Sequence, residues 1–198
     1  MIDEMIKFKK NAFDGVLCDP LCDEYKREWY NAGADKEELV RLCLRQQSIP
    51  YFATYCYNKK GLSKRYITST FGDYINGYTI HDADMVGGYT YGLYVDYSYD
   101  NYIIVDKDVL HIMWSKCNVD IPKTKCPILY VSNKSNLSIS CDGYNSVKIY
   151  LFDESNILLD DVDYDTDICV YKYSKDCDVI LGKYCLGKVK EHRKELRL

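Results

Sequence analysis

Residues 136–181 read NLSISCDGYNSVKIYLFDESNILLDDVDYDTDICVYKYSKDCDVIL and repeat one short unit. Apolar residues recur in pairs with one residue between them, and successive pairs start 10, 10, 11 and 11 residues apart. The pairs are Leu137/Ile139, Val147/Ile149, Ile157/Leu159, Ile168/Val170 and Val179/Leu181. The residues directly before the pairs are small and polar: Asn136, Ser146, Asn156, Asp167 and Asp178. We therefore expect each unit to be a turn residue followed by a short strand with one face inward.

A regular spacing of short strands suits two architectures. One is a parallel β-solenoid, in which two or three units make one coil, and the other is an antiparallel β-sandwich or meander. Stacked coils place equivalent corners above each other, so the recurring polar residue favours the solenoid. Between residues 128 and 181, Asp142-Gly143 is the only hairpin-like pair. We predict the solenoid and keep the antiparallel sandwich as the alternative. Weaker units precede it at Ile103/Val105, Leu110/Ile112, Val119/Ile121 and Ile128/Tyr130.

The first half of the chain carries helix signals instead. Asp35 followed by Glu38 is similar to a capping box, and apolar residues at three- and four-residue spacing come after it. Pro50 suits the first turn of a helix, and Ser63 suits an N-cap. The predicted helices cover residues 36–47, 50–57 and 64–71, and Asn76-Gly77 then makes a turn. The residues expected to face inward are Leu39, Leu42, Cys43, Tyr66, Ile67 and Phe71.

These patterns predict an α+β protein in three parts. Residues 1–86 are expected to form a small helical N-terminal cap region, 87–185 the β-repeat region, and 186–198 a basic C-terminal tail. A solenoid has open ends that would polymerise, so natural solenoids are capped. The tail carries five Lys or Arg residues, and we expect it to be a polar capping helix.

Composition excludes several classes of protein. The net charge of −4 gives no bias towards nucleic acid, and the helix predicted at 64–71 has only Lys64 and Arg65 as basic residues, so no DNA partner is expected. No apolar run of about 18 residues exists, and the start MIDEMIKFKK lacks an apolar signal core. We expect a cytoplasmic protein without a membrane span. Its ten cysteines are then reduced thiols that fill the core.

No pattern in the chain points to a cofactor, a metal or a catalytic residue. Cys18 and Cys22 lack a second pair at zinc-ligand spacing. An EF-hand counted from Asp161 needs Gly and Glu where the chain has Thr166 and Lys172. P-loop, dinucleotide-binding and nucleophile-elbow motifs do not occur.

Two surfaces are candidates for binding a partner. Between residues 153 and 167 there are seven acids and no Lys or Arg: Asp153, Glu154, Asp160, Asp161, Asp163, Asp165 and Asp167. Strand alternation would point Asp161, Asp163, Asp165 and Asp167 outward, with Val162 and Tyr164 on the inner face. Such a ridge suits a basic partner, although a solvated face is the simpler interpretation.

The second candidate surface is a run of tyrosines: Tyr89, Tyr91, Tyr94, Tyr97, Tyr99 and Tyr102. Of these, Tyr97 and Tyr99 are the binding candidates, while others must line the core.

The first eighty residues carry a resemblance to a known group of proteins. The matching segments are FKKNAFD (8–14), Cys18, Pro20, Glu28-Trp29, Gly61-Leu62-Ser63, Tyr66-Ile67, Phe71 and Asn76-Gly77-Tyr78. They resemble a family of uncharacterised proteins encoded by phages and mobile elements of gut anaerobes. Members join a short helical N-terminal region to a strand-rich, repeat-like region. The resemblance implies an accessory protein of a phage or mobile element, and it implies no activity.

Three classes of function follow as hypotheses. The first is a non-enzymatic protein that binds a host macromolecule through a protein partner, for example an inhibitor of a host defence complex. The second is a structural virion or fibre component, since solenoids make rigid rods. The third is an enzyme acting on polysaccharide through clustered carboxylates, of which Asp161, Asp163 and Asp165 are the candidates. The oligomeric state is left open.

Overall fold

The chain divides into two compact units, which are described here separately. The computed structural model describes residues 23–46, 63–82, 88–98 and 102–194. One unit comprises residues 1–75 and 196–198, and the other comprises residues 76–195. The helix predicted over 50–57 lies outside the described residues.

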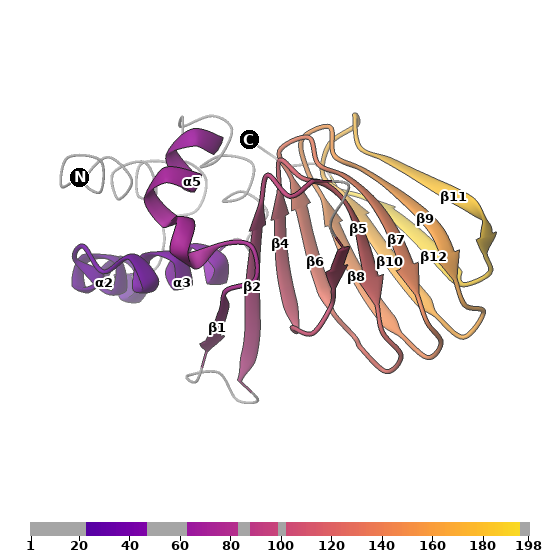
Figure 1. The fold of residues 1–198 in the computed structure, drawn as a ribbon, viewed down its shortest axis with the longest axis horizontal. Helices are drawn as coiled ribbons and strands as arrows, with labels where there is room; N and C mark the ends of the chain where they lie inside the picture. Colours follow the sequence, from indigo (N-terminus) through magenta and orange to yellow (C-terminus); the bar gives the residue numbers. More distant parts are fainter. Residues whose placement is uncertain (1–22, 47–62, 83–87, 99–101, 195–198) are drawn as a thin grey trace. The chain divides into compact units, whose positions relative to one another are not determined.

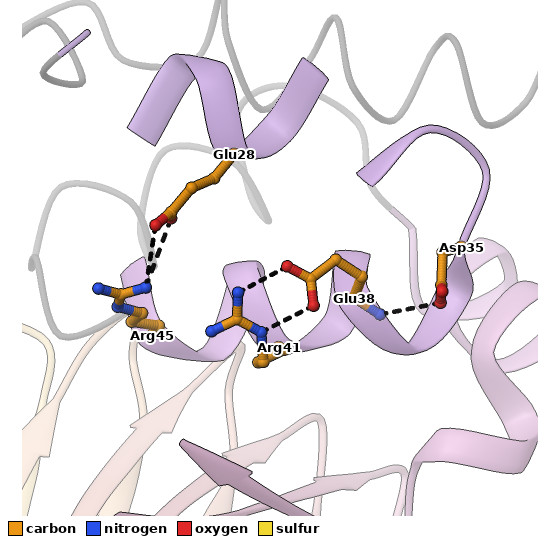
Figure 2. A network of polar contacts seen from close by, with 5 residues as sticks. All are labelled: Glu28, Asp35, Glu38, Arg41 and Arg45. Atoms are coloured by element: carbon orange, nitrogen blue, oxygen red, sulfur yellow. Dashed lines mark hydrogen bonds and ion pairs between the residues drawn. The ribbon is translucent and has the colours of Figure 1, made fainter. Parts of the chain in front are cut away.

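In the first unit, helix α2 (Asp23–Ala32) precedes helix α3 (Lys36–Gln46). Figure 2 shows the contacts that hold them: Arg45 Nη1 donates to Glu28 of α2 over 3.3 Å, and the Glu38 amide donates to Asp35 Oδ1 over 3.1 Å. The capping box is only half formed, because the Glu38 carboxylate binds Arg41 at 2.6 Å instead of reaching back to Asp35. The helix predicted over 36–47 is confirmed, and its residues Leu39, Leu42 and Cys43 are buried.

Helix α5 (Lys64–Phe71) is confirmed with its cap. The Ser63 hydroxyl accepts a hydrogen bond from the Tyr66 amide over 3.2 Å, and the 3-10 helix η2 (Gly72–Tyr74) follows. Ile67 and Phe71 are buried, while Tyr66 is half-buried. These apolar residues therefore form the inward face that their spacing predicts.

The second unit contains two sheets, and from β2 onward successive strands of the chain belong to them in turn (Figure 1). In the order of their pairing, the strands of the seven-stranded sheet are β1 (Thr79–Asp82), β2 (Tyr89–Val95), β4 (Val109–Met113), β6 (Ile128–Ser132), β8 (Ser146–Leu151), β10 (Asp167–Lys172) and β12 (Lys188–Arg193). Those of the five-stranded sheet are β3 (Tyr102–Ile104), β5 (Lys116–Ile121), β7 (Asn136–Cys141), β9 (Asn156–Val162) and β11 (Asp178–Cys185).

Strand pairing settles the choice between solenoid and sandwich. Among the described strands every pair is parallel except β1 with β2. Leu137 pairs with Ile157, and Ile157 pairs with Val179, so one coil takes 20 to 22 residues and contains two of the predicted units. The second unit is therefore a β-solenoid of about five turns, and the antiparallel sandwich is excluded.

The core lies between the two sheets and is built from the repeated apolar pairs. Eight of the ten predicted residues are at most 3% exposed: Leu137, Ile139, Val147, Ile149, Ile157, Leu159, Ile168 and Val170. The thiols of Cys117, Cys141 and Cys177 fill gaps in the same core, as predicted, whereas Cys126 is exposed. Burial of each such aliphatic side chain stabilises the fold by about 1.5–3 kcal/mol.

One predicted pair has the wrong register. The residues of β6 that enter the core are Leu129 and Val131, not Ile128 and Tyr130. Leu129 pairs with the core residue Leu110 of the preceding coil, and this stacking fixes the face. A shift of one residue turns every side chain of a strand to the other face, so Tyr130 points out of the core.

The polar residue before each pair is confirmed as a corner residue. Asn136, Ser146, Asn156, Asp167 and Asp178 are the first residues of β7 to β11. Two of them form a ladder, in which Asn156 Nδ2 donates to Asn136 Oδ1 over 3.1 Å. Asn156 Oδ1 in turn accepts from the Asp178 amide over 2.9 Å. The same residue type recurs because each coil places it directly above the last.

The C-terminal end of the solenoid differs from the prediction in two ways. Residues 188–193 form strand β12, which pairs with β10, and not a capping helix. Helix propensity in this basic segment is overridden because the edge of β10 offers backbone partners along its whole length. Leu181 stands opposite the buried Leu159, but it is 56% exposed because no described strand covers the last coil.

Candidate functional site

The acidic residues of 153–167 lie in two groups and not along one ridge. Asp153 and Glu154 occupy the turn between β8 and β9. Asp160 and Asp161 lie near the far end of β9, and the turn and strand that follow carry Asp163, Asp165 and Asp167. At about 3.3 Å per residue, the length of β9 separates the two groups by about 20 Å. The expectation of one continuous ridge is therefore wrong.

The predicted alternation of outward and inward residues stops at Val162, where β9 ends. Val162 is buried as expected, but Tyr164 is 70% exposed and does not face the core. Thr166 takes the next buried position, directly before β10. The chain turns here, and a turn does not keep the two-residue period of a strand.

The turn between β7 and β8 stacks on the turn between β9 and β10. The Asp163 amide donates to the Cys141 carbonyl over 3.1 Å. In the other direction, the Gly143 amide donates to Asp163 Oδ2 over 2.7 Å. These bonds hold Tyr144, which is 66% exposed, in the turn next to that of Tyr164. Two exposed tyrosines therefore stand on adjacent coils.

We call this surface the acidic tyrosine corner. It consists of Asp142, Tyr144, Asp160, Asp161, Asp163, Tyr164, Asp165 and Asp167, of which Asp165 alone is half-buried and the others are exposed. The field of its carboxylates reaches the core. Burial raises the pKa of the Cys141 thiol to about 12, and Cys185 and Asp120, followed by Asp142 and Asp163 of the corner, add to this effect.

This arrangement suits contact with a basic surface. Exposed tyrosines offer a large contact area at low entropic cost, and their ring faces attract Arg and Lys. The surrounding carboxylates add electrostatic steering and charge-assisted hydrogen bonds. Six carboxylates and two tyrosines, in two stacked turns and the strand ends beside them, can therefore hold Arg and Lys side chains of a partner.

The tyrosines selected from the sequence do not belong to this corner. Tyr97 is half-buried and packs edge-to-face on Tyr94, with ring centroids 5.3 Å apart, so it serves mainly the core. Tyr99 lies outside the described residues. Tyr144 and Tyr164 were missed, although a separation of one coil at turn positions was a signal that could have found them.

A second missed feature is an aromatic ladder on the outer face of the seven-stranded sheet. The rings of His111, Tyr130, Tyr150, Tyr171 and His192 stack in order, with centroids 4.8, 4.8, 4.9 and 5.0 Å apart. This is the spacing of neighbouring strands, so each coil contributes one ring. Exposure rises along the ladder, from the buried His111 to the exposed His192.

The thiols of the core are poor candidates for chemistry. Burial raises the pKa of Cys117 to about 12 and also raises the pKa of Cys177. A protonated thiol is neither a strong nucleophile nor a metal ligand. Within the described ranges, no group of three or more His, Cys, Asp or Glu side chains is placed to hold a metal ion.

The geometry defines the class of this protein as a two-sheet parallel β-solenoid with an acidic, tyrosine-bearing corner. Comparison with protein-family models, with curated proteins and with solved structures found no match. None of the described helices is long and apolar enough to cross a membrane.

Proposed function

We propose that this protein is a non-enzymatic binding protein that holds a basic protein partner on the acidic tyrosine corner. The observation that carries the proposal is the pair Tyr144 and Tyr164, which are 66% and 70% exposed on adjacent turns among six carboxylates. Large aromatic side chains exposed at a rigid corner are typical anchors of protein interfaces. The corner is rigid because backbone hydrogen bonds link its turns from coil to coil.

The setting of this function is part of the same proposal. The resemblance of the first eighty residues to proteins of phages and mobile elements supports an accessory role in which the partner is a host macromolecule. An inhibitor of a host defence complex is one concrete form. That form agrees with a surface whose charge is complementary to Arg- and Lys-rich proteins.

Site-specific photocrosslinking tests the proposal. A benzophenone amino acid replaces Tyr164 in one variant and Tyr102, a 66% exposed tyrosine on β3, in a matched control. In cells of the host, position 164 should give one discrete adduct whose yield falls with added salt, because screening weakens charge contacts. Position 102 should give none. If positions 164 and 102 gave the same series of crosslinked products, a specific interface at the corner would be contradicted.

A further inference from the structure

Within the part of the chain that the structure describes, the last coil of the solenoid leaves two strand edges without a neighbour. β12 ends the seven-stranded sheet and β11 ends the five-stranded sheet, and neither has a further neighbour among the described strands. An unpaired edge presents backbone N–H and C=O groups in a row, ready to pair with another extended segment.

Apolar side chains of the last coil are also exposed, because no further described coil covers them. Leu159 is fully buried, whereas its partner Leu181 on β11 is 56% exposed. On the outer face of the same strand, Ile180 and Tyr184 are 53% and 59% exposed. An added strand would cover apolar surface that the earlier coils cover for each other.

Charge decides what kind of segment fits. On β12, Lys188 and Lys190 are exposed on the outer face, on either side of Val189, which packs against the core. The single acid of this strand, Glu191, is bound to Lys172 at 3.1 Å. From Lys188 to Lys190 the free edge of β12 therefore alternates between basic positions and an apolar one, before Glu191.

A second copy of the chain fits this edge poorly. Two β12 strands paired antiparallel would bring Lys188 and Lys190 against the same side chains of the other copy. Like charges opposite each other destabilise a strand pair, and edge lysines are a known device against such pairing. Charge complementarity instead selects a segment with acids opposite these lysines.

We propose that the edge of β12 accepts an extended segment of a partner protein in which acidic and apolar residues alternate, added as a further strand of the seven-stranded sheet. Its acids would face Lys188 and Lys190, and its apolar residue would lie beside Val189 over the open core. Strand addition of this kind takes its affinity from backbone hydrogen bonds and its selectivity from alternate side chains. This site does not depend on the acidic tyrosine corner.

Fluorescence anisotropy with short labelled peptides tests the proposal. The probe alternates Asp and Val, one control has the same composition in two blocks, and another alternates Lys and Val. The alternating Asp–Val peptide should bind saturably, and the two controls should not. Lys190→Glu should weaken binding about tenfold, whereas Lys116→Glu, an exposed lysine on β5, should leave it unchanged.

Two further results separate the outcomes. The double variant Tyr144→Ala/Tyr164→Ala should bind the Asp–Val peptide normally, so failure of the corner proposal would leave this one standing. Equal binding of all three peptides, or none, would overturn strand addition. Light scattering that finds a dimer of the wild type, made tighter by Lys190→Glu because the new acid faces Lys188 of the other copy, would show that a second copy occupies the edge and would also overturn it.

Discussion

The backbone amide of Ser135 donates a hydrogen bond to the hydroxyl of Ser155, 3.2 Å away on the next coil, and both side chains are fully buried. The Ser115 amide makes the same bond to the Ser135 hydroxyl over 3.0 Å. At the next coil the Ser155 amide donates within its own turn, to the Phe152 carbonyl over 3.1 Å. The serine column connects coil to coil inside the corner that precedes β5, β7 and β9.

Replacing Ser135 with alanine should destabilise the solenoid by about 1–3 kcal/mol, because the buried Ser115 amide loses its acceptor. Urea unfolding measures the change. Ser138→Ala, on the outward face of β7, should change stability by less than about 0.5 kcal/mol. Equal effects of the two substitutions would show that the buried column does not support the fold.

The core thiols predict a loss of stability at alkaline pH. Burial raises the pKa of Cys117 from an ordinary value near 9 to about 12. A thiol whose pKa is higher in the folded state stabilises that state fully below about pH 9, and the contribution is lost as the pH rises through about 12. The free energy of unfolding should therefore fall across this range. In Cys117→Ala the slope should be shallower by up to about 1.4 kcal/mol per pH unit. Substitution of the exposed Cys126 should leave the wild-type slope unchanged.

The aromatic ladder predicts energetic coupling between neighbouring rings. Tyr150 stacks on Tyr171 with ring centroids 4.9 Å apart. A double-mutant cycle with Tyr150→Ala and Tyr171→Ala should give a coupling of about 0.5–1.5 kcal/mol. Tyr89 and Tyr150, which are not stacked on each other, serve as the control pair and should be additive. Additivity in both cycles would mean that the ladder is only a consequence of strand spacing.

At Gly187, directly before β12, the structure leaves no room for a side chain. A Cβ atom at this position would lie 2.6 Å from Val162 Cγ1 and 2.9 Å from the Thr166 carbonyl oxygen. Gly187→Ala should therefore destabilise the solenoid by about 1–3 kcal/mol. Gly72→Ala has no atom within 4 Å of the new Cβ and should not change unfolding of the solenoid. Calorimetry measures the unfolding temperature of each variant. Equal unfolding temperatures would contradict the steric limit at Gly187.

The sequence was sufficient to predict the solenoid where alternation was clean. Leu137/Ile139 and Val147/Ile149 are separated by the polar residues Ser138 and Lys148, so their face was determined. Around Leu129 every residue from Ile128 to Val131 is apolar, and alternation cannot choose between the two faces of such a run. Only stacking on the neighbouring coils decides that register.

The candidate site was predictable only in part. Asp160, Asp161, Asp163, Asp165 and Asp167 do gather at one corner, but Asp153 and Glu154 are separated from them by a strand. Tyr164 was assigned to the core because the strand was expected to continue through the turn. In a solenoid, residues that are one coil apart in the sequence are neighbours in space. Tyr144 therefore lies beside Tyr164 although 20 residues separate them.

The most direct test of the central claim is quantitative capture from lysate of the host under native conditions. Three baits are compared: the wild type, Tyr144→Ala/Tyr164→Ala, and the matched control Tyr102→Ala. The account predicts that the wild type and the control recover the same basic protein in stoichiometric amount, while the corner variant recovers at least about tenfold less. Recovery of that protein at equal levels by all three baits, or of no stoichiometric protein by any, would contradict a binding function at the acidic tyrosine corner.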